Sequence, residues 1–276
     1  MHNVAACDAT QAMDLSAYSP VIIMRDVSVR FSAGAAEPML AVDGVSFSVR
    51  AGEFLSLVGP SGCGKTTVLN VLTGLLAQGV EGCTEILGQP PRPGNPDVAY
   101  MLARDSLLPW RTAVGNASYG MEIRGVPAKE REGIARDLLR RVGLAGFEDA
   151  YPKALSHGMR QRCALARTFA LGSPVFLMDE PFGALDAQTK LLLEEVLLDL
   201  WSSARRTVVF VTHDLAEAVA LSDRVIVMSA RPGRIVADVP ISLPRPRWVR
   251  ALQKSPQFHE VYSQLWGLLE LGMSFS

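Results

Sequence analysis

The sequence predicts an α/β protein built around a mostly parallel β-sheet. Short apolar runs of strand length alternate with segments whose apolar residues recur at helical spacing, which is the pattern of βαβ units. A glycine-rich loop stands between one such run and the helix that follows it. Candidate strands then disappear between Trp110 and Leu155, where an amphipathic helix around 134–142 indicates a helical insertion into the sheet domain.

Four apolar runs are the candidate strands, because each is short, uncharged and rich in valine, leucine or phenylalanine. They cover residues 54–58, 175–178, 208–211 and 225–228. Two of the intervening segments have apolar residues at helical spacing, so each should present one stripe to the core. The stripes consist of Val68, Val71, Leu72, Leu75 and Leu76, and of Leu193, Val196, Leu197, Leu200 and Trp201.

Composition excludes several classes of protein. The 276 residues include 27 basic and 28 acidic side chains, for a net charge of −1, so no general attraction to nucleic acid is expected. No apolar run has the length of a membrane span.

We expect a flexible extension over 1–19, one domain over 20–247 with a helical subdomain at about 104–165, and a helical tail over 248–276.

The glycine-rich loop matches the pattern GxxxxGK[ST] and is flanked by a candidate strand and a candidate helix. Its glycines would let backbone amides approach phosphate, the helix N-terminus adds its dipole, the lysine reaches the terminal phosphates and the first threonine can ligate Mg²⁺. A glycine-rich turn with an exposed lysine is the alternative, which the correct flanks disfavour. The residues are Gly59, Pro60, Ser61, Gly62, Cys63, Gly64, Lys65, Thr66 and Thr67.

Polar side chains end two further candidate strands. Asp179 could hold a phosphate-bound Mg²⁺ and Glu180 could polarise an attacking water, whereas alone the pair could simply begin a loop. His213 follows the strand over 208–211 and would lie at the same sheet edge, although a lone histidine there is more often an ordinary loop residue. Several strands that end in phosphate-relevant groups favour a catalytic site.

The stretch Leu155–Arg162 contains an LSxG string between the phosphate loop and the Asp179 strand. Alone, the string would be a helix N-cap with Ser156 accepting backbone amides. In this order, the motifs resemble the ATPase subunits of ABC transporters over roughly residues 21–247. The resemblance implies a RecA-type P-loop NTPase core, an N-terminal antiparallel β subdomain and a helical insertion that carries the signature string.

The same resemblance implies roles for individual residues. Phe31 would stack on adenine, Thr66 and Asp179 would bind Mg²⁺, Glu180 would be the catalytic base and His213 a γ-phosphate sensor. The cofactors implied are ATP and Mg²⁺.

The functional unit implied is a homodimer with two composite sites. Ser156 and Gly158 would face ATP held by the other protomer, and the segment 184–186, with Asp186, would cross to that protomer.

The segments 107–112, 229–235 and 244–247 are similar to those in the ATPases of nitrate, sulfonate and taurine importers. That type implies transmembrane permease subunits, an indirect extracytoplasmic solute-binding protein, no nucleic acid, and a peripheral position on the cytoplasmic face of the cell membrane. The function predicted is ATP hydrolysis that drives uptake of a small solute.

Two positions depart from the family pattern. Ala103 stands where the family has a glutamine that would touch Mg²⁺ and link the nucleotide to the permease, and His157 stands where glycine is usual. His157 is tolerable if only Gly158 approaches phosphate closely. Ala103 leaves two alternatives open: a subunit that hydrolyses ATP, and an ATP-binding clamp with weak turnover. A soluble ABC ATPase acting on DNA or ribosomes is disfavoured by the absence of a basic stripe.

Overall fold

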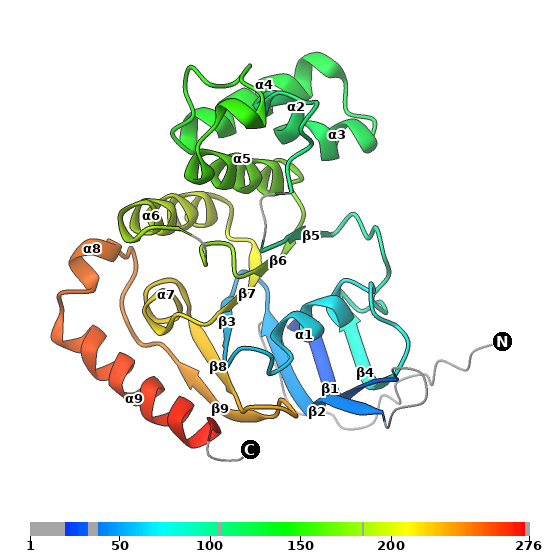
Figure 1. Ribbon diagram of the computed structural model, residues 1–276, viewed down its shortest axis with the longest axis vertical. Coiled ribbons are helices and arrows are strands. Elements are labelled where there is room, and N and C mark those ends of the chain that lie inside the picture. The colour runs from blue at the N-terminus through cyan, green and yellow to red at the C-terminus, as the bar shows by residue number, and fades with distance from the viewer. Residues whose placement is uncertain (1–19, 33–37, 104–105, 184, 274–276) are drawn as a thin grey trace.

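The computed structural model describes residues 20–32, 38–103, 106–183 and 185–273. The extension over 1–19 and Ala184 therefore lie outside the described residues. Figure 1 shows a central sheet, a small second sheet beside it, a lobe of helices above, and a C-terminal helix along the opposite flank. None of the described helices combines the length and the apolar character that crossing a membrane requires.

The main sheet has six strands. They are β3 (Phe54–Val58), β5 (Val98–Met101), β6 (Val175–Asp179), β7 (Thr207–Thr212), β8 (Arg224–Met228) and β9 (Ile235–Pro240). Their order is β5-β6-β7-β3-β8-β9, with parallel pairing from β5 to β8 and an antiparallel edge strand β9. All four strands expected from the sequence are present, and the mostly parallel α/β fold is confirmed.

The second sheet is antiparallel and has the order β2-β1-β4. Its strands are β1 (Pro20–Phe31), β2 (Met39–Arg50) and β4 (Val80–Ile86). Along β2, buried and exposed residues alternate from Gly44 to Arg50, as expected for a sheet with one face on the core. This sheet is the antiparallel β subdomain that the resemblance implied.

Four of the helices form a lobe of their own, and the others lie along the sheets (Figure 1). The helices are α1 (Lys65–Leu72), α2 (Ala113–Ala117), α3 (Tyr119–Ile123), α4 (Ala128–Arg141), α5 (His157–Ala170), α6 (Ala187–Ala204), α7 (Leu215–Leu221), α8 (Val249–Leu252) and α9 (Pro256–Met273), with a short 3₁₀ turn η1 (Pro152–Ala154) before α5. Helices α2 to α5 make the upper lobe in Figure 1, and α6 lies between this lobe and the sheet. The lobe extends beyond residue 165, the expected limit of the helical subdomain, because α5 continues to Ala170.

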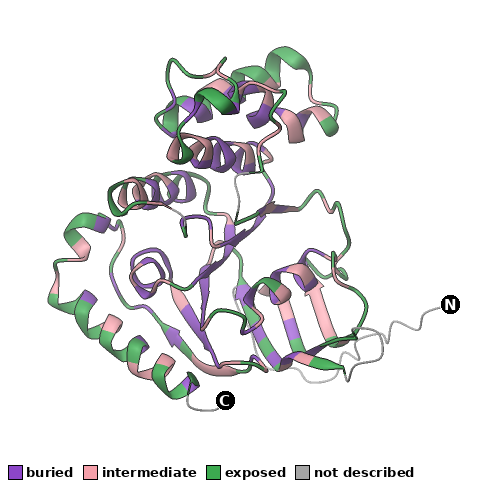
Figure 2. Cartoon of the chain, in the orientation of Figure 1, coloured by how far each residue is buried: buried purple, intermediate pink, exposed green. Residues whose placement is uncertain are grey.

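Alternate side chains of the main sheet enter two separate cores, although every residue of β3 and β7 is buried. Phe54 and Phe210 face the core that α6 and α7 cover, where the ring of Phe54 meets that of Trp201 edge to face at 5.7 Å. Leu55 and Leu57 face the other core, with α1 and the antiparallel sheet. Figure 2 shows the central strands buried and the outer faces of the helices exposed.

Helix α1 is shorter than the sequence suggested. It ends at Leu72, and Leu75, which was expected on its buried stripe, is 61% exposed. The reason is Gly74, which adopts a φ of +73° and packs so closely on the backbone of Arg92 that a Cβ there would lie 2.7 Å from it. A left-handed glycine is a common helix terminator, and here tertiary contact fixes it.

The C-terminal helix α9 packs on the main sheet. Phe258 and Leu265 are buried in the core that α7 also covers. At its end, the backbone carbonyl of Gly272 accepts a hydrogen bond of 3.1 Å from the amide of Ala230, in the loop after β8. The tail over 248–276, as far as the structure describes it, is therefore part of the packed domain.

Candidate active site

Three parallel strands end at one edge of the main sheet, and each delivers a polar group there. The order β6-β7-β3 and the pairings Val58 with Thr212 and Asp179 with Val211 put the three strand ends side by side. Ligands bind outside the carboxyl ends of strands in such sheets. The glycine-rich loop after β3, Glu180 after β6 and His213 after β7 therefore share one site.

The loop between β3 and α1 has the shape of a phosphate cradle. Gly62 and Gly64 have φ values of +77° and +104°, a region that only glycine adopts without strain. A Cβ at Gly64 would also lie 2.7 Å from Cγ2 of Val42. Lys65 is 5% exposed, and its Nζ donates to the carbonyls of Gly59 at 2.7 Å and Pro60 at 3.0 Å. These two hydrogen bonds hold the ammonium group of Lys65 against the first two residues of the loop.

Thr66 and Asp179 form the pair of oxygen donors expected for a metal. The hydroxyl of Thr66 lies 3.1 and 2.9 Å from the two carboxylate oxygens of Asp179. Asp179 is 5% exposed, and burial raises the pKa of its carboxyl, against the hydrogen bond from Thr66. No group of three or more His, Cys, Asp or Glu in the described part of the chain is placed to hold a metal. Two hard oxygens fit Mg²⁺, which takes few protein ligands and keeps phosphate and water ligands.

Glu180 and His213 are directly paired. Oε2 of Glu180 lies 3.0 Å from Nδ1 of His213. Glu180 has a φ of +42°, unusual for a residue with a side chain, and its amide donates to the carbonyl of Val211 at 2.9 Å. Backbone strain of this kind is concentrated at functional sites. The carboxylate is held at the end of β6 with the imidazole as its partner.

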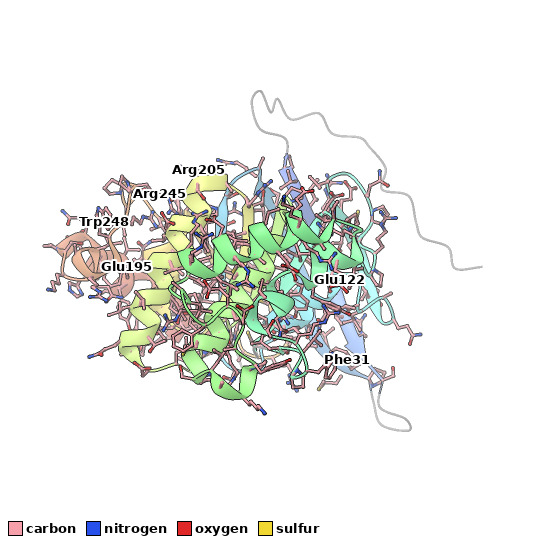
Figure 3. The ribbon with its side chains drawn as sticks, turned by 90° about the horizontal axis from the view of Figure 1, so that it is seen from above. Phe31, Glu122, Glu195, Arg205, Arg245 and Trp248 are labelled. Carbon is pink, nitrogen blue, oxygen red and sulfur yellow. The ribbon has the colours of Figure 1, made fainter. Side chains whose placement is uncertain are left out.

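A cavity of about 270 Å³ joins the loop to the antiparallel sheet. Its lining consists of Phe31, Met39, Ala41, Ser61, Gly62, Gly64, Lys65, Thr66, Thr67, Glu180 and Arg231. Figure 3 shows Phe31 on the side of the molecule away from Arg245 and Trp248. Cavities of about 450 and 630 Å³ lie elsewhere, but the linings of both lack the phosphate loop and the strand-end carboxylates.

Three residues of the loop predicted to bind nucleotide do not line this cavity: Gly59, Pro60 and Cys63. Cys63 packs in the core that α1 covers, and this burial raises the pKa of its thiol. A Cβ at Gly59 would lie 2.9 Å from the sulfur of Cys63. Gly59 and Cys63 are thus packed against each other, and the carbonyls of Gly59 and Pro60 accept hydrogen bonds from Lys65.

Ser156, Gly158 and Asp186 lie at helix starts and do not line the cavity of their own chain. Ser156 caps α5, accepting the amide of Met159 at 3.2 Å, and Asp186 caps α6 through the amides of Gln188 and Thr189. A Cβ at Gly158 would lie 2.8 Å from Cγ2 of Thr189. Contact with α6 is therefore a reason within the chain for glycine at 158.

The two departures from the family pattern are on the surface. Ala103 is exposed, beyond the end of β5, and is followed by Arg104 and Asp105, which lie outside the described residues. His157 is exposed as well, and its Nδ1 lies 3.4 Å from a guanidinium nitrogen of Arg160. Its side chain finds room on the first turn of α5.

Sequence reasoning missed two residues that belong to the site's architecture. The amide of Gln161, on α5, donates to the carbonyl of Pro181, directly after Glu180. Arg231, after β8, lines the cavity itself. Gln161 lies within the stretch Leu155–Arg162 and Arg231 within the segment 229–235, but the sequence assigned neither of them a role, and only the folded chain brings them to the site.

A partly buried ion cluster ties the start of α6 to the start of α7. Nζ of Lys190 lies 2.9 Å from Oδ2 of Asp214 and 2.9 Å from Oε1 of Glu217. Burial alone would lower the pKa of Lys190, but these two carboxylates raise it above its ordinary value. The cluster fixes the residue after His213 to the helix that Asp186 caps.

Comparison with known proteins agrees with this geometry. A family model described as ABC transporter matches residues 42–183. An ATP-binding protein of Brucella abortus is 43% identical over 90% of this chain and 92% of its own length. A taurine import ATP-binding protein of Rhizobium johnstonii is 39% identical over 88% of this chain and 94% of its own length.

Among solved structures, the dimeric ATP-binding cassette MJ0796 has a similar fold. In a post-hydrolysis state bound to ADP and phosphate, that cassette matches with a TM-score of 0.69 and 27% identity, over 81% of this chain and all of its own. A second dimeric structure of it, described as a bacterial ABC transporter cassette, matches with a TM-score of 0.70.

Proposed function

Because this chain belongs to the ABC transporter family and is an ATPase, we propose that it powers an importer for a small solute such as a sulfonate, taurine or nitrate. The observation that carries the proposal is the Glu180–His213 pair, next to the Thr66–Asp179 pair and on the cavity that contains Lys65. The closeness of these groups supports Glu180 as base, Thr66 and Asp179 as metal donors and Lys65 as the cation that binds phosphate.

In this proposal the phosphate loop binds and orients ATP. The amides at the N-terminus of α1 and the ammonium of Lys65 would replace water around the triphosphate. Phe31, which lines the cavity and is 37% exposed, would offer a face on which adenine stacks. Thr66 and Asp179 would hold Mg²⁺, which when bound neutralises charge on the phosphates.

Glu180 is the residue we assign to water activation. Its carboxylate lines the cavity, and His213 fixes its orientation through the contact at 3.0 Å. A water hydrogen-bonded to Glu180 would lose its proton to the carboxylate as it attacks the terminal phosphate. His213 would in addition lie within reach of that phosphate.

The proposal includes a homodimer, because Ser156, Gly158 and Asp186 have no place on the cavity of their own chain. The solved structures of the dimeric cassette support this arrangement. Each α5 N-terminus would then complete the ATP site of the opposite protomer, with its dipole directed at the γ-phosphate.

We expect Ser156→Asp to separate helix capping from this contact between protomers. Aspartate caps a helix as well as serine does, so α5 should keep its stability, within about 0.5 kcal/mol. The added negative charge would repel the partner's triphosphate, so ATP-dependent dimerisation should be lost. Light scattering with and without ATP, beside thermal unfolding, measures both. The control is Ser156→Asn, which caps without charge; if the aspartate variant dimerises as well as the asparagine variant, the assignment is wrong.

The partners in this proposal are transmembrane permease subunits, which place the chain at the cytoplasmic face of the cell membrane, and an extracytoplasmic solute-binding protein. Relatives that are 39% and 40% identical are described as taurine import ATP-binding proteins, which supports a small anionic or zwitterionic solute.

Uptake in cells tests the importer assignment. Deleting the gene for this chain should abolish uptake of one solute from a labelled panel of taurine, an alkanesulfonate and nitrate. The wild-type chain should restore uptake and Glu180→Gln should not. Unchanged uptake of all three would contradict the solute class, whereas restoration by Glu180→Gln would contradict the role of hydrolysis.

A clamp subunit with weak turnover is the second candidate, and its motive is Ala103. Ala103, which is exposed after β5, has no side-chain amide at the position where the family has glutamine. All residues assigned to hydrolysis are nevertheless assembled. The rate of the wild-type chain relative to Glu180→Gln separates the two candidates, because a clamp would lose little on removal of its base.

A further inference from the structure

Arg231 lines the same cavity as Phe31 and Lys65, and the mechanism above leaves it without a role. It follows β8, in the segment 229–235, and is far in sequence from the glycine-rich loop and from Phe31. Its side chain is exposed, and its hydrogen bonds among the described residues go to neutral groups and not to a carboxylate. A guanidinium on an ATP cavity without an acidic partner is available to a ligand.

The guanidinium is held in a defined position. Nε and Nη2 donate to the carbonyl of Gly62 at 3.3 and 3.2 Å, and Nη1 lies 3.0 Å from the sulfur of Met39. These contacts span the cavity from the glycine-rich loop to β2. Arg231 is therefore oriented by neutral groups, which do not cancel its charge.

The loop that carries Arg231 is fixed on three sides. The amide of Gly233 donates to Ala41 at 3.0 Å, and the amide of Asp43 donates back to Gly233 at 3.0 Å. Gly233 packs so tightly that a Cβ there would lie 2.0 Å from the carbonyl of Cys63. From the other side, the end of α9 accepts the amide of Ala230. The C-terminal helix thus helps to position Arg231.

One neighbour of Arg231 links it to Phe31, the residue proposed to stack on adenine. Met39, which its Nη1 touches, pairs with Phe31 across β1 and β2. Lys65 and Thr66, which would hold phosphate and metal, follow Gly62 by three and four residues in the glycine-rich loop, and the hydrogen bonds of Arg231 go to neither of them. A planar guanidinium stacks on aromatic faces and donates to ring and hydroxyl acceptors.

We propose that Arg231 is a nucleotide-binding residue that holds the base and ribose of ATP, beside Phe31 and Met39, and leaves the phosphates to Lys65 and the loop. The inference rests on the proposed function of this cavity. It assigns to the segment after β8 a direct part in recognising the nucleoside. It also gives α9 a part in that recognition, through the hydrogen bond to Ala230.

Calorimetric titration of the full chain with two probes, ATP and inorganic tripolyphosphate, tests the proposal. Arg231→Met, which keeps an unbranched apolar stem but removes the guanidinium, should weaken ATP binding about tenfold, the typical effect of losing a charged or stacking contact. Tripolyphosphate has no nucleoside, so its affinity should stay within about twofold of the wild type, as for a surface change. Arg231→Lys should also weaken ATP binding, because lysine lacks the planar group.

The matched control is Arg234→Met in the same loop. Arg234 pairs with Asp43 at 2.5 Å and does not line the cavity, so neither affinity should change. Equal weakening of both probes by Arg231→Met would make Arg231 a phosphate anchor and overturn the proposal, as would no weakening of ATP. Failure of the wild-type chain to bind ATP would instead overturn the proposed function, and Lys65→Ala should weaken both probes.

Discussion

Glu180→Gln is expected to slow ATP hydrolysis by about 10²- to 10⁴-fold, the range typical of removing a general base. Glutamine keeps the size of the side chain and one oxygen that can face His213, but it cannot accept the proton of the attacking water. ATP binding should persist, because Lys65 and the loop are untouched. Steady-state phosphate release gives the rate, and gel filtration with ATP and Mg²⁺ should show an accumulated dimer.

The control for this variant is Glu132→Gln, on the exposed surface of α4. It removes one carboxylate far from the strand ends and should leave the rate within about twofold of the wild type. If Glu180→Gln hydrolyses ATP as fast as this control, Glu180 is not the base and the clamp function becomes the better account of the chain.

Glu194 should make the protein less stable as the pH rises toward 8. This residue of α6 is 1% exposed, and its Oε2 is buried without a hydrogen-bond partner among the described residues. Burial raises the pKa of its carboxyl to about 8, and the negative charges of Glu217 and Asp214 act in the same direction. The folded chain therefore holds a proton there that the unfolded chain has released above pH 4.5.

A raised pKa in the folded state gives stability that is complete below the unfolded pKa and is lost as the pH rises through the folded one. The unfolding free energy should therefore fall by up to about 1.4 kcal/mol per pH unit between roughly pH 5 and 8, on the order of 3 kcal/mol in all. Glu194→Gln, which stays neutral, should flatten this slope. Urea unfolding at four pH values in this window measures it.

Glu195→Gln is the matched control, since it changes the next residue of the same helix. Glu195 is more exposed and lies 3.6 Å from Arg250, so its loss should leave the slope in place. The assignment would fail if the two variants had the same pH profile, or if the wild-type stability rose over this range.

The strands were the most predictable part of the fold. Runs such as 54–58 and 208–211 are buried on both faces, and only a central parallel strand accommodates so continuous an apolar segment. The helix after the phosphate loop was predicted less well, because Leu75 and Leu76 continue its periodicity. Gly74 is the local stop signal, but the contact that makes it decisive is with Arg92, 18 residues further on, and the local pattern does not show that contact.

The site divides in the same way. Each residue that a motif contains could be named from the sequence, because phosphate, metal and proton transfer require particular side chains at fixed spacing. The structure brings Thr66 to Asp179 and Glu180 to His213. For Gly158, the sequence suggested approach to phosphate, and the structure adds the contact with Thr189 on α6.

By itself, the sequence determined the α/β class, the phosphate loop and the polar residues that follow the strands, since these depend on composition and spacing along the chain. Tertiary structure alone decided where α1 ends, that Oε2 of Glu194 is buried without a hydrogen-bond partner in the described part of the chain, and that the segment after β8 reaches the cavity of the glycine-rich loop. The physical reason is that these three features arise from contacts between segments whose separation in sequence is large. The placement of Arg231 shows it best, because its neighbours Gly62 and Met39 come from the other end of the chain.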